Sequence, residues 1–226
     1  MVRAGALVLA AGLCATTQVA GASERMSETA VLAEINRART QPRTVAADLR
    51  RYRAAFQGRV AREPGEAIGV TTNEGVRAVD EAIAFLERQA PLPPLAHGSV
   101  LARAAQGWAA EQGRAGGHGH RSGGSVSAGA RVRAAGGDIY VGETISYGMD
   151  TPARVVRQLI VDDGQPSRGH RALLFSTGFR YAGVGCGGHA RWGSMCVVDL
   201  ASTPDGGPAP SLLAAAQPAR AIALSR

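Results

Sequence analysis

The stretch YVGETISYGMDTPARVVRQLIVDDGQPSRGHRALLF, residues 140–175, carries most of what the chain reveals about its fold and its chemistry. Thr151 and Pro152 form a favourable N-cap and first-turn pair for a helix. The apolar residues that follow recur on one face with the period of a helix. We therefore expect a helix over residues 153–162, ending where an acid, Asp162, lies beside the apolar face and needs a partner.

Imidazole and carboxylate side chains gather in and just before this stretch. Two imidazoles with two carboxylates can hold a divalent cation such as zinc, or share protons in acid–base work. Each also has a plainer interpretation, such as capping a turn or, for Asp163, pairing with Arg168 or Arg171, which we favour over ligation for that residue. The candidates are His118 and His120 in a glycine-rich loop, Glu143 in a glycine-flanked turn, Asp162, Asp163 and His170.

Residues 1–22 have the pattern of a secretory signal peptide. Arg3 supplies a minimal basic region, residues 4–14 an apolar run, and the AGA triplet at 20–22 a cleavage site. The apolar run is too short to be a convincing transmembrane helix. We expect cleavage after Ala22 and a secreted or periplasmic protein that does not span the membrane.

The cysteines fit export. Cleavage removes Cys14 and leaves Cys186 and Cys196. An even pair, close in sequence, in an exported chain is most simply one local disulfide. The spacing predicts a hairpin of two strands, over residues 181–187 and 195–200, joined across by that bond.

The net charge is +7, from 25 basic residues, all of them arginine, against 18 acidic residues. Several cluster within residues 37–62, where a basic face would suit nucleic acid or an anionic surface. Acids are interspersed there and aromatic residues are few, so solvated helical faces are the better interpretation. We expect no nucleic-acid partner.

The remaining pattern divides the chain in two after the predicted signal peptide. Residues 23–90 read as a helical N-terminal extension with a loop over 58–69, and residues 91–201 as the main domain. Residues 202–226 read as a flexible tail. Besides the helix over 153–162, the periodicity predicts helices over residues 28–40, 44–56, 72–89, 99–112 and 128–135.

The order of the motifs resembles the CAP superfamily, also called SCP-like, in its bacterial secreted form. That group includes the cysteine-rich secretory proteins, insect venom antigen 5 and plant pathogenesis-related proteins. Each motif is weak alone, and their order is what is specific over about residues 95–201. The matching pieces are the histidine loop, GETI at 142–145, QLIVDDG at 158–164, RGHR at 168–171 and the closing VGCGGHARWGSMCVVDLA.

The resemblance implies an α+β fold, an α–β–α sandwich with a small, mainly antiparallel sheet between helical layers. It also implies a polar cavity with two histidines and two acids. Carried over position by position, these are His120, Glu143, Asp162 and His170, with His118 and Asp163 as the alternatives. The chain departs from the family pattern twice: the second acid is normally glutamate, and tryptophan often stands where Leu159 is.

Three classes of function suit such a cavity. We expect a monomeric extracellular binding module whose His120, Glu143, Asp162 and His170 hold a divalent cation (zinc, magnesium or calcium) and whose ligand is unknown, a lipid or an envelope component among the options. The first alternative is a metal-dependent peptidase or esterase, although Ser167 is the only nearby hydroxyl and nothing marks it as an activated nucleophile. The second alternative, an ability reported for the family at large, is a carrier of sterol or fatty acid.

Overall fold

The computed structural model describes residues 26–121 and 126–209. The predicted signal peptide with Cys14 and all of the predicted tail beyond residue 209 lie outside the described residues.

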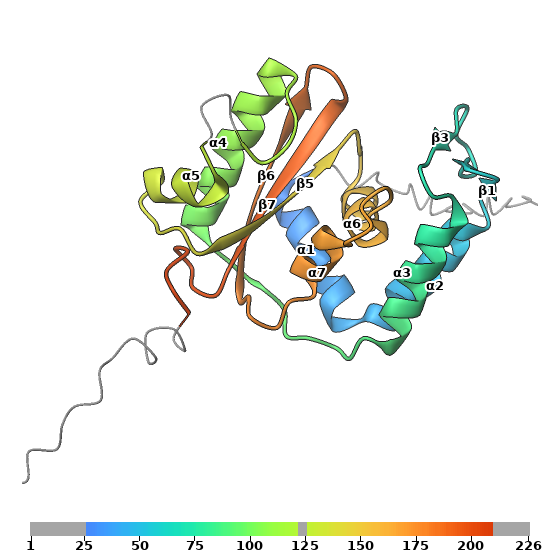
Figure 1. Cartoon of the computed structure of the whole chain (residues 1–226), viewed down its shortest axis with the longest axis horizontal. Helices are drawn as coiled ribbons and strands as arrows, with labels where there is room; N and C mark the ends of the chain where they lie inside the picture. Colours follow the sequence, from blue (N-terminus) through green and yellow to red (C-terminus); the bar gives the residue numbers. More distant parts are fainter. Residues whose placement is uncertain (1–25, 122–125, 210–226) are drawn as a thin grey trace, which may run out of the picture.

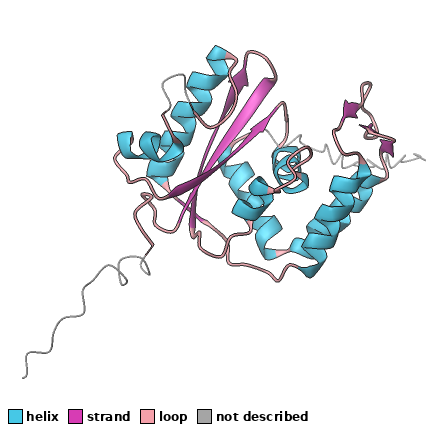
Figure 2. Cartoon of the chain, viewed as in Figure 1, coloured by secondary structure: helices cyan, strands magenta, loops and turns pink. Residues whose placement is uncertain are grey.

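A four-stranded sheet forms the middle of the molecule, and helices cover both of its faces (Figures 1 and 2). The strand order is β4-β6-β7-β5; β4 and β6 are parallel, and the other neighbours are antiparallel. This confirms the expected α–β–α sandwich with a mainly antiparallel sheet. The strands are β4 (Ala96–His97), β5 (Val141–Tyr147), β6 (Tyr181–His189) and β7 (Gly193–Ala201).

The two helical layers enclose separate parts of the core. On one face, Trp108 packs with Ile145 and Val197. On the other, Val31 and Leu159 belong to a larger cluster that also includes sheet residues. The first layer holds α4 (Ser99–Ala115) and α5 (Ala128–Ala134); the second holds α1 (Glu28–Thr40), α6 (Pro152–Val161) and α7 (Gly169–Leu174).

A helical hairpin of α2 (Pro42–Arg53) and α3 (Val76–Arg88) lies outside the second layer (Figure 1). The sequence predicted a loop over residues 58–69 between its helices. In the structure this loop belongs to a small antiparallel sheet: one strand lies within the loop and two flank it. Each strand is two residues long, which is too short to leave a period in the sequence. They are β1 (Phe56–Gln57), β2 (Val60–Ala61) and β3 (Val70–Thr71).

The predicted hairpin and its disulfide are confirmed. Strands β6 and β7 are antiparallel, and Cys186 lies opposite Cys196 in their register. The two sulfurs are bonded. The bond therefore joins two central strands of the sheet.

Two local differences matter for the site. Glu143 lies within strand β5, not in the predicted turn. Helix α6 ends at Val161, and Asp162 is its C-cap, with a left-handed backbone (φ 55°). The helix therefore stops one residue earlier than predicted, and the carboxylate of Asp162 is free to reach past its end.

Candidate functional site

The four side chains singled out by motif order lie together as two imidazole–carboxylate pairs. His120 Nδ1 lies 2.8 Å from Oε1 of Glu143. His170 Nδ1 lies 2.7 Å from Oδ1 of Asp162. The centres of the two imidazole rings are 6.2 Å apart. Groups that are 50 residues apart in the chain thus meet at one place.

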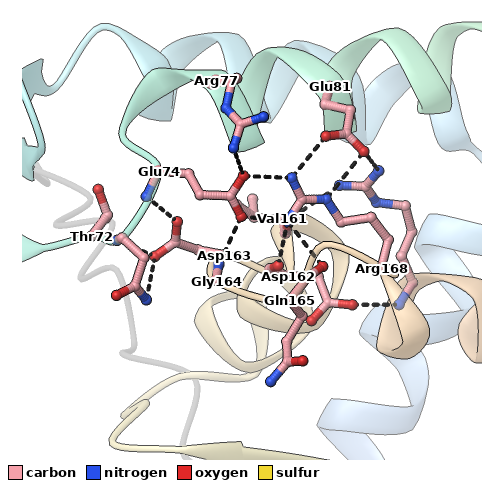
Figure 3. A network of polar contacts seen from close by, with 12 residues as sticks. Thr72, Glu74, Arg77, Glu81, Val161, Asp162, Asp163, Gly164, Gln165 and Arg168 are labelled. Atoms are coloured by element: carbon pink, nitrogen blue, oxygen red, sulfur yellow. Dashed lines mark hydrogen bonds and ion pairs between the residues drawn. The ribbon is translucent and has the colours of Figure 1, made fainter.

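The two alternatives raised by the sequence have other surroundings. His118 is exposed, and its ring lies edge-on to Trp192 with 6.2 Å between ring centres. Asp163 accepts hydrogen bonds from the backbone N–H groups of Asn73 at 2.6 Å and Glu74 at 2.8 Å (Figure 3). Asp163 therefore does not pair with Arg168 or Arg171 as predicted. It bonds the backbone of the turn before α3 instead.

Glu143 links His120 to an arginine on the neighbouring helix. Its second oxygen accepts a hydrogen bond from Nη2 of Arg131 on α5. The Arg131 guanidinium lies 4.3 Å from the centre of the Trp108 ring. Nη1 of the same arginine donates to the main-chain oxygen of His120 at 3.1 Å. The carboxylate and the loop that carries the imidazole are thus held by one partly buried cation.

Three side chains fix the backbone of the histidine loop. Tyr147 donates its hydroxyl proton to Oε1 of Gln112 at 2.5 Å and accepts the N–H of Gly119 at 2.9 Å. Gln112 Nε2 donates to the oxygen of Gly119 at 2.8 Å. His189 Nε2 lies 2.8 Å from the oxygen of Gly117. Burial raises the pKa of Tyr147 and so keeps it a neutral donor.

Asp162 holds His170 through both of its oxygens. While Oδ1 contacts the ring, Oδ2 accepts the backbone N–H of His170 at 2.9 Å and that of Arg171, more weakly, at 3.4 Å. The carboxylate therefore caps the first turn of α7 and orients the imidazole that this turn carries.

A third carboxyl group lies behind Glu143. Asp199 on β7 is directly opposite Glu143 on β5 and is fully buried. Neither of its side-chain oxygens has a hydrogen-bond partner within the described part of the chain. Burial, and then the charge of Glu143, raise the pKa of Asp199 well above its ordinary value, against the opposing effect of Arg131. Burial beside a second acid therefore favours the neutral form of the Asp199 carboxyl group.

Both imidazoles face a cavity of about 600 Å³. The imidazole–carboxylate side of its lining includes His120, Asp162 and His170. Its lining also includes Ile68 and Val70 of the small sheet region, which are largely exposed apolar side chains. Within residues 26–121 and 126–209, no group of three or more His, Cys, Asp or Glu side chains forms a ready set of metal ligands.

The family model of CAP, the cysteine-rich secretory protein family, matches residues 32–200. The chain belongs to this family. No curated protein matches it. The matched range of this CAP protein begins within α1 and includes α2 and α3, which the sequence analysis had assigned to an N-terminal extension. Among the residues described, none of the helices of the CAP protein is both long and apolar enough to cross a bilayer.

The sequence did not point to the residues that support the two pairs in this CAP domain. Arg131 looked like one of many arginines, and Tyr147 like a strand aromatic. Asp199 carried one usable signal, because a lone acid within the apolar run MCVVDLA of a predicted buried strand is unusual. That signal indicates a special environment for the acid without indicating its partner.

Proposed function

We propose that this CAP domain is an exported binding module in which His120 and His170 take up a divalent cation at the cavity. The observation that carries the proposal is that each imidazole offers Nδ1 to a buried carboxylate. A histidine that donates from Nδ1 to a carboxylate has its Nε2 lone pair available for a metal, and such a partner makes it a better ligand.

The separation of the rings supports a single shared ion. Zinc–nitrogen bonds of about 2.1 Å put an ion about 3.2 Å from each ring centre. Two rings on one ion therefore have centres no more than about 6.5 Å apart. The observed separation of 6.2 Å between His120 and His170 falls inside this limit.

In this proposal the two acids orient the histidines and do not ligate. Glu143 and Asp162 are each committed to an imidazole and to a further donor, Arg131 in one case and a backbone N–H in the other. The shorter side chain of Asp162 suffices because it has to reach only the helix turn beside it. When bound, the cation supplies a Lewis acid with open positions for a ligand from outside the chain.

Export is supported by the signal-peptide pattern of residues 1–22, by membership of the CAP family and by the disulfide between Cys186 and Cys196. Disulfides persist in oxidising compartments and are rare in the cytosol. The proposal therefore places the cavity in a secreted or periplasmic protein.

Isothermal calorimetry with zinc, magnesium and calcium tests the cation. We expect zinc to bind to the wild type and binding to be lost in His120→Ala and in His170→Ala. His97 is an exposed histidine on β4, so His97→Ala is the matched control and should bind zinc like the wild type. Absence of heat with all three metals, or equal heat from the site variants, would reject the proposal.

The same variants decide whether the cavity also catalyses hydrolysis. Ser167 is exposed, and among the described residues no serine or cysteine side chain is hydrogen-bonded to either imidazole. Hydrolysis at this site would therefore have to use a water on the bound metal. Peptide and ester substrates incubated with zinc-loaded wild type and with His120→Ala test for it. Cleavage that disappears in His120→Ala would assign an enzyme to the site.

A further inference from the structure

Arg168 is a buried cation between helix α3 and the turn that carries Asp162 (Figure 3). Its side chain is only 10% exposed. Nη1 pairs with Oε1 of Glu74 at 2.6 Å, and Nη2 pairs with Oε2 of Glu81 at 2.8 Å. Both acids belong to α3 or to the turn that starts it. The guanidinium therefore joins the outer helical hairpin to the site loop.

The same guanidinium shapes the site loop from inside. Nη1 also donates to the main-chain oxygens of Asp162 at 2.8 Å and of Gln165 at 3.1 Å. The loop between α6 and α7 therefore wraps around the side chain of Arg168. Without that donor, the oxygen of Asp162 would keep only the longer hydrogen bond from the N–H of Gln165 at 3.2 Å, which is less favourable.

The backbone at both ends of this loop is strained. Within the described chain, Asp162 (φ 55°) and Arg168 (φ 51°) are the two residues other than glycine that have a positive φ. Such a conformation is unfavourable for a side chain as long as arginine and persists only where surrounding contacts require it. The hydrogen bonds of the Arg168 guanidinium lie at both ends of this loop and can offset that cost.

We propose that Arg168 is a positioning residue: through it, the position of helix α3 determines the position of the His170 imidazole. The path is continuous: Glu74 and Glu81 hold the guanidinium, the guanidinium holds the backbone of Asp162, and the carboxylate of Asp162 holds the ring and the backbone of His170. An effect of Arg168 on metal binding rests on the proposed function. The positioning of His170 by Arg168 does not.

Two further contacts join the same elements. Glu74 accepts the N–H of Gly164 at 2.8 Å, and Asp163 caps the turn before α3. Arg171 reinforces the junction: its Nη1 reaches Glu81 at 3.2 Å, and its Nε donates to the oxygen of Ile160 at 2.6 Å. The hairpin of α2 and α3 therefore supports the His170 pair, while the contacts that hold His120 come from the sheet and the opposite helical layer.

The variant Arg168→Gly tests the proposal most directly. Glycine adopts a positive φ without strain, so the variant removes the guanidinium and spares the backbone. We expect the backbone amide of His170 to exchange with solvent at least about tenfold faster, because a charge-supported hydrogen bond is loosened. In NMR spectra the ring signals of His170 should shift, while those of His120 stay in place. Arg168→Lys keeps the charge but not the planar guanidinium with its several N–H donors, so it should restore the signals in part.

A second pair of variants covers the case in which Arg168→Gly does not fold. Glu81→Gln weakens the hold on Arg168, whereas Asp80→Asn, its neighbour on α3, weakens only an exposed pair with Arg53. We expect the exchange of the His170 amide to rise in Glu81→Gln and not in Asp80→Asn. Equal effects of these two variants, or equal changes at His120 and His170 in Arg168→Gly, would overturn the proposal.

Zinc titration of the same variants separates this inference from the proposed function. If the wild type binds zinc, Arg168→Gly should bind it several-fold more weakly because one ligand is less well placed. If the wild type binds no metal, the proposed function fails, and the exchange rates still decide whether Arg168 positions His170.

Discussion

The two imidazole–carboxylate pairs share the same hydrogen bond and have very different supports. His120 belongs to a glycine-rich loop after α4, and its side chain is 50% exposed. His170 belongs to the first turn of α7, and its side chain is 23% exposed. The loop of His120 is held mainly by neutral side chains that bond its backbone, whereas the turn of His170 is held by a network of charges (Figure 3).

This difference indicates that one site can be assembled from two independently supported halves. The His120 half comprises His120, Glu143 and Arg131; the His170 half comprises His170, Asp162 and Arg168. Because no supporting residue is shared, a change in the supports of one half should leave the other half in place. The predictions that follow test this separation, beginning with the largest expected effect.

Glu143→Ala should be the most damaging of these changes. It leaves Arg131, whose side chain is 9% exposed, without its buried partner. Breaking such a pair destabilises a protein by about 3–5 kcal/mol, and we expect the lower end because Asp199 can then ionise beside the arginine. Urea unfolding measures the loss. Glu111→Ala, an exposed acid on α4, is the control and should change stability little.

Asp162→Gly should destabilise less. Glycine keeps the positive φ, so only the cap of α7 and the contact with His170 are lost, which amounts to about 1–2 kcal/mol. In the comparison of halves, the NMR signals of His170 should move while those of His120 remain. A shift of both rings would show that the halves are coupled.

Tyr147→Phe should cost about 1 kcal/mol, because it removes the hydroxyl that bonds Gln112 and Gly119 while keeping the ring. Amide exchange at Gly119 should accelerate and exchange at His170 should not. Tyr140→Phe is the matched control, since Tyr140 is half exposed and lies before β5 in the chain. Unchanged exchange at Gly119 would show that the loop is held by other contacts.

The two halves should respond to pH in opposite directions, and we expect this to be the smallest effect. In the His170 half, the Arg168 guanidinium lowers the pKa of Glu74 from 4.5 to about 2. A carboxyl group whose pKa is depressed by folding stabilises the folded state above its unfolded pKa. That contribution is lost as the pH falls from about 4.5 to about 2. In Glu74→Gln, the free energy of unfolding should therefore fall less than in the wild type as the pH is lowered through this range.

In the His120 half, burial raises the pKa of Asp199, so the sign reverses. The folded state holds a proton that the unfolded chain releases above about pH 4, so stability falls as the pH rises through that range. Asp199→Asn mimics the neutral acid and should be more stable than the wild type at pH 7, with little difference at pH 3. Urea unfolding at several pH values checks both variants, and an Asp199→Asn protein less stable than the wild type at pH 7 would contradict the neutral state.

The sequence predicted those parts of the fold whose signals are local. Thr151 caps the helix that its position indicated, and the spacing of Cys186 and Cys196 indicated the hairpin. Strand β5 was missed because its central residues, from Glu143 to Ser146, are all buried and show no alternation. Helix α7 is only six residues long, too short for a periodic pattern.

The site was predictable only as a set of residue types in order. Motif order selected His120 and His170, but which atom each acid would contact depends on where α6 stops and on the path of β5. The supporting residues could not be found from local patterns. Arg131 reaches Glu143 from a separate short helix, and Glu81 reaches Arg168 across 87 residues. Such contacts depend on tertiary packing, which leaves no local period.

The placement of the two histidines in opposite helical layers has a consequence for folding. His120 follows a helix on one face of the sheet, and His170 begins a helix on the other, so the pair exists only after both faces have been covered. A ligand that needs both rings would therefore bind the native chain and not its partly assembled forms. By mass action, such a ligand would stabilise the native state in proportion to the logarithm of its concentration relative to its dissociation constant.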